Sequence, residues 1–193
     1  MDDILIYSKT ESEHLDHVRA VLEALKRNRL HVKLKKCVFA HASIPFLGFL
    51  VTSSGVCPDP AKVKAVENWP LPSTVTEVRS LLGFANYCRR FIKNFASIAS
   101  PLTELTRASV PFPAQLSADA VASFDALKLA LTSAPLLILP KVGPDAEFAM
   151  YTDASTLAIG AVLMQDQGKG LQPVAYESRK LNAHERNYPV CDL

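Results

Sequence analysis

The sequence predicts an α+β protein. Three stretches, 10–29, 74–95 and 117–131, carry apolar residues at helical spacing, which is typical of amphipathic helices. Short apolar runs bounded by turn residues precede, separate and follow them, and these runs predict strands. The last three of these runs follow the last helix without a further helix between them, and such consecutive strands are typical of α+β folds.

The N-terminal stretch predicts a strand and then a helix. The apolar run Ile4–Ser8 follows two aspartates directly and is strand-like. The helix over 10–29 begins with a capping box, in which Thr10 and Glu13 satisfy the first backbone amides. Its apolar face is formed by Leu15, Val18, Leu22 and Leu25.

The segment after this helix is strongly basic. Leu30–Lys35 alternates apolar and cationic residues, which predicts a strand whose basic face carries Lys33 and Lys35. Six cations fall within 11 residues without an acid, namely Lys26, Arg27, Arg29, Lys33, Lys35 and Lys36. Such a run is either a solvated surface or a contact for a polyanion, and both interpretations stay open.

A hairpin and a short helix are predicted next. Phe46–Val51 is a strand-like run, and Gly48 within it marks a bulge or a close backbone approach. Asp59 as the N-cap and Pro60 at the first position begin a helix that stops before Pro70. Trp69 at its end is either a base-stacking platform or core packing, and core packing is favoured.

A longer helix is predicted from Thr74 onward. A second capping box begins it, and Gly83 inside it costs helix stability, which favours a close-packing role. Its apolar face extends as far as Phe95. Three cations and an amide share a different face and could contact phosphates: Arg79, Asn86, Arg90 and Lys93.

The C-terminal half predicts a linker, a helix and three strands. Pro101, Pro111 and Pro113 indicate the linker, and Ser117 caps the helix. The strands are expected at 147–152, 158–165 and 171–177, with a hairpin turn over 166–170.

Composition and charge exclude several classes of protein. No apolar run approaches the roughly 18 to 20 residues of a membrane span, and acids replace the basic region of a secretory signal. The four cysteines form no CxxC pattern, so reduced cysteines in an intracellular, non-secreted protein are expected. Residues 1–100 hold 14 Lys/Arg against 9 Asp/Glu, which fits a polyanionic partner.

Carboxylates near strand ends are the candidate metal ligands. Asp2 and Asp3 precede one strand-like run, and Asp153 follows another. Clustered carboxylates are costly unless they bind metal. Mg²⁺ prefers oxygen ligands, and two such ions can stabilise the attacking and leaving oxygens of phosphoryl transfer. Two acids at a terminus can equally be solvated. A second acidic cluster contains His14 and His17, but a surface helix is the favoured interpretation there.

Ordered motifs along the chain carry a resemblance to a known family. They are DDILIYS, EHLDHVRAVLEAL, KKCVF, FLGFLVTSSGV, DPAKVKAVENWPLPSTVTEVRSLLGFANYCRRFI, LTSAPLL, YTDAS, GAVLMQ, PVAYESRKL and ERNY. Together they resemble the reverse transcriptase and RNase H region of gypsy-class LTR retrotransposons over nearly the whole chain.

The resemblance implies four parts and three sets of functional residues. Residues 1–57 match the end of the palm, 58–108 the thumb, 109–146 the connection, and 147–193 a partial RNase H-like domain with a three-stranded antiparallel sheet. Asp2 and Asp3 match the aspartate pair of the polymerase motif, and Asp153 matches the first metal-binding aspartate of RNase H. The hairpin that positions the primer 3′ end is matched by Phe46, Leu47, Gly48 and Phe49.

The implied function is RNA-directed DNA synthesis with RNase H activity, both using Mg²⁺. The implied partners are the template–primer duplex, the RNA/DNA hybrid, deoxynucleoside triphosphates and other segments of a polyprotein, with no membrane. An isolated chain is expected to be inactive, since each centre keeps only some of its carboxylates. The alternatives are a non-enzymatic nucleic-acid-binding module and the product of a decayed reading frame.

Overall fold

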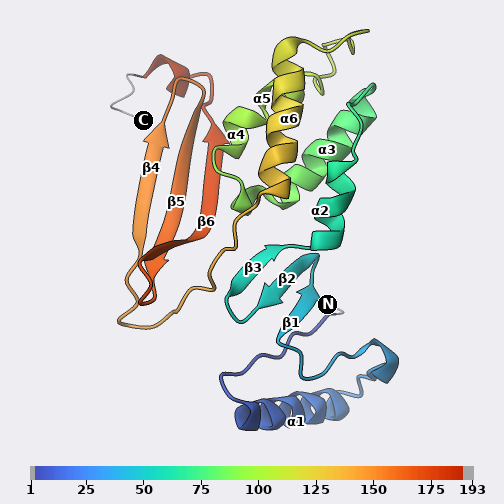
Figure 1. The fold of residues 1–193 in the computed structure, drawn as a ribbon, viewed down its shortest axis with the longest axis vertical. Coiled ribbons are helices and arrows are strands. Elements are labelled where there is room, and N and C mark those ends of the chain that lie inside the picture. Colours follow the sequence, from blue (N-terminus) through green and yellow to red (C-terminus); the bar gives the residue numbers. More distant parts are fainter. Residues whose placement is uncertain (1–2, 189–193) are drawn as a thin grey trace.

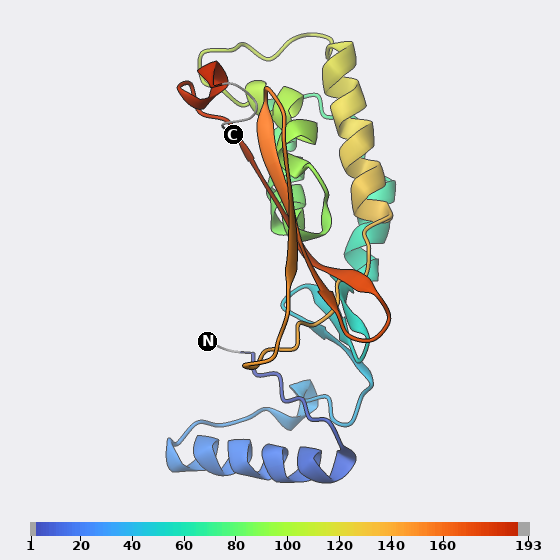
Figure 2. The ribbon, with the colours of Figure 1, turned by 90° about the vertical axis from the view of Figure 1, so that its left-hand side faces the viewer.

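The computed structural model describes residues 3–188. The molecule is elongated: one helix lies at one end, a small sheet follows, and a group of helices stands beside a second sheet (Figures 1 and 2). Each sheet has three antiparallel strands. The predicted α+β class is confirmed. No helix among the described residues is long and apolar enough to cross a bilayer.

The first helix, α1, spans Glu11–Arg27. Its start is as predicted, because the Thr10 hydroxyl accepts a hydrogen bond from the Glu13 amide at 3.3 Å. The predicted apolar face has no fully buried residue within residues 3–188, and the side chains of Leu15 and Leu22 remain 65% and 43% exposed. The helix pattern is therefore confirmed, while the burial that the pattern indicates is not achieved within this part of the chain.

Two predicted strands are wrong. Residues 4–8 have no regular structure, and Leu30–Lys35 is irregular apart from a 3-10 turn at Leu34–Lys36. A strand needs a neighbour for its amides and carbonyls, and no described strand pairs with either segment. The apolar side chains that alternate with the basic residues stay largely exposed, so they do not pack against a core in this part of the chain.

The first sheet is a three-stranded meander of β1 (Ser43–Phe46), β2 (Phe49–Thr52) and β3 (Gly55–Pro58). Phe46 pairs with Phe49, so Leu47 and Gly48 form a two-residue turn with φ of 46° and 72°. Two positive φ angles are typical of the type I′ turns that suit hairpins. The predicted hairpin is therefore confirmed, but the strand-like run Phe46–Val51 is interrupted, and Gly48 lies in a turn instead of a bulge.

Five helices form the core of the molecule. They are α2 (Pro60–Glu67), α3 (Val75–Tyr87), α4 (Phe95–Ile98), α5 (Ser100–Glu104) and α6 (Ala118–Thr132). The predicted caps are present: Asp59 accepts from the Ala61 amide at 2.9 Å, Thr74 from Glu77 at 3.2 Å, and Ser117 from Ala120 at 3.2 Å. The core contains Val78, Leu81, Ala85, Phe91, Ile92, Leu102, Leu127 and Leu131.

The long predicted helix ends early. α3 stops at Tyr87, a 3-10 turn follows at Arg89–Phe91, and Asn94 adopts a left-handed conformation (φ 56°, ψ 31°). A left-handed residue cannot continue an α-helix. The apolar spacing persists across the break because these short pieces all bury their apolar side chains in the same core.

Three further expectations for the helices have mixed outcomes. Pro101 lies in the first turn of α5, where its missing N–H costs nothing, so it is not part of a linker. A Cβ added to Gly83 would meet no atom within 4 Å, so the predicted close packing is also wrong. Trp69 packs against Phe84, with ring centroids 6.1 Å apart, which confirms core packing.

The second sheet consists of β4 (Ala149–Ala154), β5 (Ala158–Asp166) and β6 (Leu171–Lys180), close to the predicted ranges. The predicted turn is present, and the Asp166 carboxylate accepts three backbone amides from residues 168–170 at 2.7 to 3.2 Å. β6 is the strand nearest the helices and contacts α4. β4 forms the outer edge.

The segment after α6 joins the two sheets. Leu137 and Val56 exchange two backbone hydrogen bonds of 2.8 and 2.9 Å, and the Ile138 amide donates to Pro173 at 3.0 Å. A Cβ at Gly55 would lie 2.2 Å from the Leu137 carbonyl oxygen, so only glycine permits this approach.

Candidate nucleic-acid interface

The primer-positioning candidates form the tip of the first hairpin. Leu47 is 59% exposed at the turn, whereas Phe49 packs inward against the helical core. A Cβ at Gly48 would lie 2.5 Å from the Nζ of Lys62 and 2.6 Å from the hydroxyl oxygen of Tyr87. The predicted close approach at Gly48 is therefore confirmed, and its cause is the side chains of α2 and α3.

Tyr87 holds this turn in place. Its hydroxyl donates a hydrogen bond to the Leu47 carbonyl, and its ring stacks on that of Phe49 at 4.6 Å with 8° between the planes. Burial is the main cause that raises the pKa of Tyr87, so the phenol stays a donor at neutral pH.

The predicted stripe of phosphate-binding residues is not one stripe. Since α3 ends at Tyr87, Asn86 lies on the helix, Arg90 in the 3-10 turn and Lys93 in the loop before α4, all three exposed. Arg79 donates to the Thr106 carbonyl at 3.1 Å and so connects α3 to the turn after α5. The expectation of a continuous helical face is wrong, because the 3-10 turn and the left-handed Asn94 change the direction of the chain after α3.

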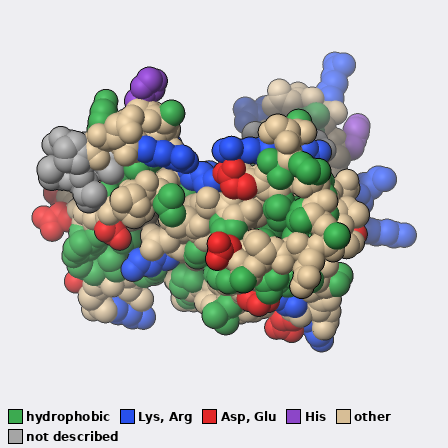
Figure 3. Space-filling model, turned by 90° about the horizontal axis from the view of Figure 1, so that it is seen from above, with side chains coloured by type: hydrophobic (Ala, Val, Ile, Leu, Met, Phe, Trp, Pro, Cys, Tyr) green, Lys and Arg blue, Asp and Glu red, His purple; other side chains and the backbone are tan. Residues whose placement is uncertain are grey.

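Basic and acidic side chains occur together on the face that Figure 3 shows. Lys and Arg side chains lie between the two raised parts of the molecule, with Asp and Glu side chains beside them. Lys33 and Lys35 belong to a different region, the exposed irregular segment near α1. They do not form the basic face of a strand, since that strand is not present.

Asp153 lies on the edge strand β4, at one end of a row of three residues across the second sheet. It pairs with Gly160, which in turn pairs with Ser178, so the three residues share one face. The Ser178 hydroxyl accepts the Ala96 amide at 2.9 Å, which identifies this face as the one that α4 covers. Asn94 and Ser97 line a small hollow together with Asp153, whose side chain is exposed.

The described residues do not complete a two-metal centre. Asp3 is exposed in an irregular segment, and Asp2 lies outside the described residues. Within 3–188, no three His, Cys, Asp or Glu side chains converge as metal ligands would. Asp3 and Asp153 offer carboxylate oxygens of the kind that Mg²⁺ prefers, but one described carboxylate at each place is too few for a two-metal site.

The histidines of α1 contact a serine. The hydroxyl of Ser8 lies 3.1 Å from Nδ1 of His14 and 2.8 Å from Nδ1 of His17. This contact attaches the preceding segment to the helix surface, in agreement with the favoured interpretation of a surface helix.

Arg89 was not singled out by sequence reasoning. Its guanidinium donates to the Glu177 carboxylate and, at 2.5 Å, to the Ser178 carbonyl on β6. Lys180 of the same strand pairs with Glu104 of α5 at 3.1 Å. These contacts join the sheet to the helices, and no local pattern indicates them because the Arg89–Glu177 partners are 88 positions apart.

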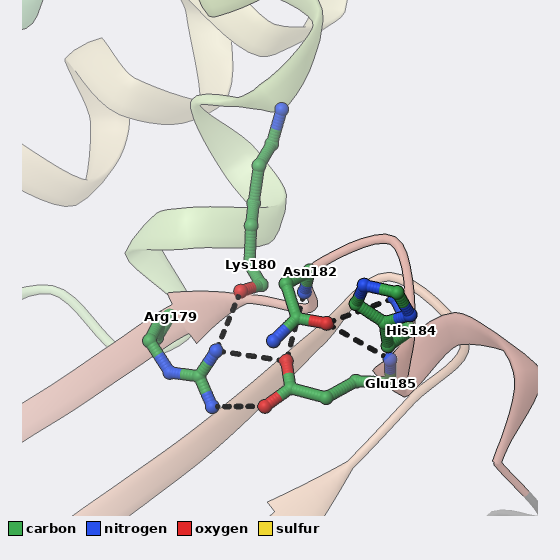
Figure 4. Close-up of polar contacts among 5 residues, drawn as sticks. All are labelled: Arg179, Lys180, Asn182, His184 and Glu185. Atoms are coloured by element: carbon green, nitrogen blue, oxygen red, sulfur yellow. Dashed lines mark hydrogen bonds and ion pairs between the residues drawn. The ribbon is translucent and has the colours of Figure 1, made fainter.

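A second unpredicted cluster closes the end of β6 (Figure 4). Arg179 forms two parallel hydrogen bonds with Glu185, each of 2.9 Å, and Glu185 also accepts the Asn182 amide at 2.8 Å. The Asn182 side chain accepts the amides of His184 and Glu185 at 2.9 Å. The hydrogen bonds from Arg179 are the largest cause that lowers the pKa of Glu185 to about 2.

Comparison with known proteins finds family matches at both ends of the chain. Residues 1–51 match the family described as reverse transcriptase (RNA-dependent DNA polymerase), and residues 116–193 match the RNase H-like domain found in reverse transcriptase. The Pol polyprotein from transposon opus of Drosophila melanogaster is 40% identical over 201 residues, covering 100% of this chain and 20% of that protein. The Pol polyprotein from transposon gypsy, also of Drosophila melanogaster, is 36% identical, covering 97% of this chain and 19% of that protein.

A yeast relative agrees with these matches, and two solved structures share the fold. The transposon Tf2-3 polyprotein of Schizosaccharomyces pombe is 36% identical over all of this chain and 14% of its own length. The foamy viral protease-reverse transcriptase dRH in complex with double-stranded DNA has a TM-score of 0.81 at 24% identity, over 96% of this chain and 32% of that chain. The foamy viral protease-reverse transcriptase in complex with an RNA/DNA hybrid has a TM-score of 0.78 at 24% identity, over 96% of this chain and 25% of that chain. The chain thus spans a fifth or less of these polyproteins.

Proposed function

Because the chain belongs to the reverse transcriptase and RNase H region of LTR-retrotransposon Pol polyproteins, we propose that it holds the template–primer duplex in such an enzyme. The observation that carries the proposal is the arrangement around Tyr87. The anchored hairpin of residues 46–49 lies on one side of it in the structure, and the exposed Asn86, Arg90 and Lys93 lie on or directly after the same helix end.

The chemistry of these groups suits a nucleic-acid backbone. Arg90 and Lys93 offer cations that neutralise phosphates, and Asn86 offers an amide donor. The solved relatives with the same fold are complexes with double-stranded DNA and with an RNA/DNA hybrid, which supports the choice of a duplex as the ligand.

In the parent polyprotein we assign the chain to an RNA-directed DNA polymerase with RNase H activity, acting on deoxynucleoside triphosphates and on RNA/DNA hybrids. Asp2 and Asp3 would hold Mg²⁺ at the polymerase centre, and Asp153 at the RNase H centre. There Mg²⁺ would stabilise the charge of phosphoryl transfer. The remaining carboxylates would come from other segments of the polyprotein, since the relatives extend well beyond the matched region. The isolated chain is then a duplex-binding unit without turnover.

Fluorescence anisotropy with a labelled RNA/DNA hybrid, titrated across salt, tests the duplex-binding proposal. Wild-type chain is expected to bind, with affinity that falls steeply as salt rises. The double variant Arg90→Ala/Lys93→Ala should bind more weakly, with the logarithmic salt slope smaller by about 1 for each phosphate contact removed.

Lys169→Ala is the matched control, because Lys169 is an exposed cation in the turn between β5 and β6. It should leave both affinity and slope unchanged. Absence of binding at low salt, or equal salt slopes for wild type and the double variant, would overturn the proposal.

A further inference from the structure

We infer that Tyr87 is a positioning residue for the primer terminus, because it fixes the hairpin of residues 46–49 to the helical core. The inference rests on the proposed function. It adds a residue from α3 to a site whose members otherwise come from the hairpin, together with a physical reason why the hairpin tip has one defined position.

Three contacts converge on the turn. The Tyr87 hydroxyl donates to the carbonyl of Leu47, the residue at the tip. The Phe49 ring lies 4.6 Å from the Tyr87 ring and nearly parallel to it. Lys62 of α2 has its Nζ 5.4 Å from the centre of the Tyr87 ring, a cation–π contact that ties α2 to the same residue.

The backbone of the turn depends on these contacts. Leu47 is a non-glycine residue with φ of 46°, a conformation that persists where the surroundings determine it. Gly48 has no Cβ, so the Lys62 ammonium and the Tyr87 hydroxyl can approach to positions that a side chain at 48 would occupy. The glycine at the tip therefore serves two purposes, the turn geometry and the contact with Tyr87.

The contact extends into the core. Phe49 also packs against Phe91, at 5.5 Å between ring centroids, and Phe91 is only 2% exposed. The tip, the end of α3 and the 3-10 turn therefore pack against one another through these rings. Because Arg90 lies in that turn, the primer end at Leu47 and the duplex backbone at Arg90 would be held at a fixed separation.

Hydrogen exchange of the full chain without ligand tests the anchoring contact itself. Tyr87→Ala removes both the hydrogen bond and the stack, and should speed exchange of the backbone amides in residues 46–52 by at least about tenfold, which corresponds to the loss of roughly one hydrogen bond. Tyr87→Phe keeps the stack and should give a smaller increase. Tyr7→Ala removes a tyrosine that is 83% exposed and should change nothing. Unchanged exchange at 46–52 in Tyr87→Ala would overturn the inference.

Crosslinking tests the positioning role. The probe is an RNA/DNA hybrid whose recessed primer ends in a photoreactive 4-thiothymidine. The protein is added at a concentration that saturates the probe, so that differences in affinity do not change the crosslinking yield. Wild type should crosslink at residues 46–49, Tyr87→Ala should lose at least about tenfold of that product, and Tyr87→Phe should recover most of it.

The outcomes separate the two proposals. If wild type binds and Tyr87→Ala crosslinks at residues 46–49 as well as wild type, the positioning role is overturned and duplex binding stands. If wild type binds no hybrid, duplex binding is overturned and the positioning role falls with it. A loss of crosslinking that Tyr87→Phe does not rescue, with equally lowered unfolding temperatures, would indicate a structural role and also overturn the inference.

Discussion

Arg89 and Glu177 form an ion pair that joins the helical core to the second sheet across 88 positions of the chain. Arg89 reaches it from the 3-10 turn after α3, and its guanidinium also lies 5.6 Å from the ring centre of Phe95. The same side chain donates to the Ser178 carbonyl on β6. The face of the sheet that carries Asp153 is therefore held at a defined place relative to the proposed duplex-binding residues.

Replacing Arg89 should cost more than replacing its acidic partner. Arg89→Ala removes the donor to the Ser178 carbonyl as well as the ion pair, and should lower the free energy of unfolding by about 1 to 3 kcal/mol. Glu177→Gln should cost less than about 1 kcal/mol, because the carboxylate is 66% exposed and the pair is screened by water. Urea denaturation followed by circular dichroism measures both, and equal effects would contradict the assigned roles.

Two glycine-to-alanine substitutions should change the stability of the fold in opposite directions. At Gly55, φ is 152° and the new Cβ would lie 2.2 Å from the Leu137 carbonyl oxygen, so Gly55→Ala should destabilise by about 2 to 4 kcal/mol. At Gly83, in the middle of α3, a Cβ meets nothing within 4 Å. Gly83→Ala should therefore stabilise by about 0.5 to 1 kcal/mol. Thermal unfolding of the two variants beside wild type measures both effects, and a destabilised Gly83→Ala chain would refute the open space at that position.

The turn after β6 should weaken in acid. The folded-state pKa of Glu185 is lowered to about 2, so its contribution to stability is complete above the ordinary carboxyl pKa of 4.5. That contribution is lost as the pH falls through the window between these two values. Carboxyl chemical shifts followed by NMR should report a midpoint near 2 for Glu185. Arg179→Ala should move the midpoint back toward 4.5, and an unmoved midpoint would exclude Arg179 as the main cause.

The thiol of Cys88 should be unreactive in the folded chain. Burial raises its pKa to about 11, and only the thiolate reacts with alkylating agents. Cys37 is only half-buried. Iodoacetamide at a pH of about 8 should therefore modify Cys37 and spare Cys88 until denaturant is added, as read by peptide mass spectrometry. Rapid native modification of Cys88 would show that α3 opens far more readily than its packing indicates.

Local structure and family membership were both predictable from the amino-acid sequence. The caps at Thr10, Asp59, Thr74 and Ser117 were predictable because donor and acceptor lie within three residues of each other. The strands of the second sheet were predictable because residues typical of turns mark where one strand ends and the next begins. The ordered motifs sufficed for the family resemblance, which the matches over residues 1–51 and 116–193 bear out.

The remaining features came from the tertiary structure, because each depends on groups distant in sequence. The runs at 4–8 and 30–35 look like strands, but a strand forms only where a neighbour accepts its hydrogen bonds, and no described strand pairs with them. The end of α3 at Tyr87 is hidden by an apolar pattern that continues through the break. Tyr87 meets Leu47 across 40 positions and Arg89 meets Glu177 across 88, and no periodicity encodes such contacts. Residues that are distant in sequence come into contact because they bury a shared core, and that burial is a property of the whole fold.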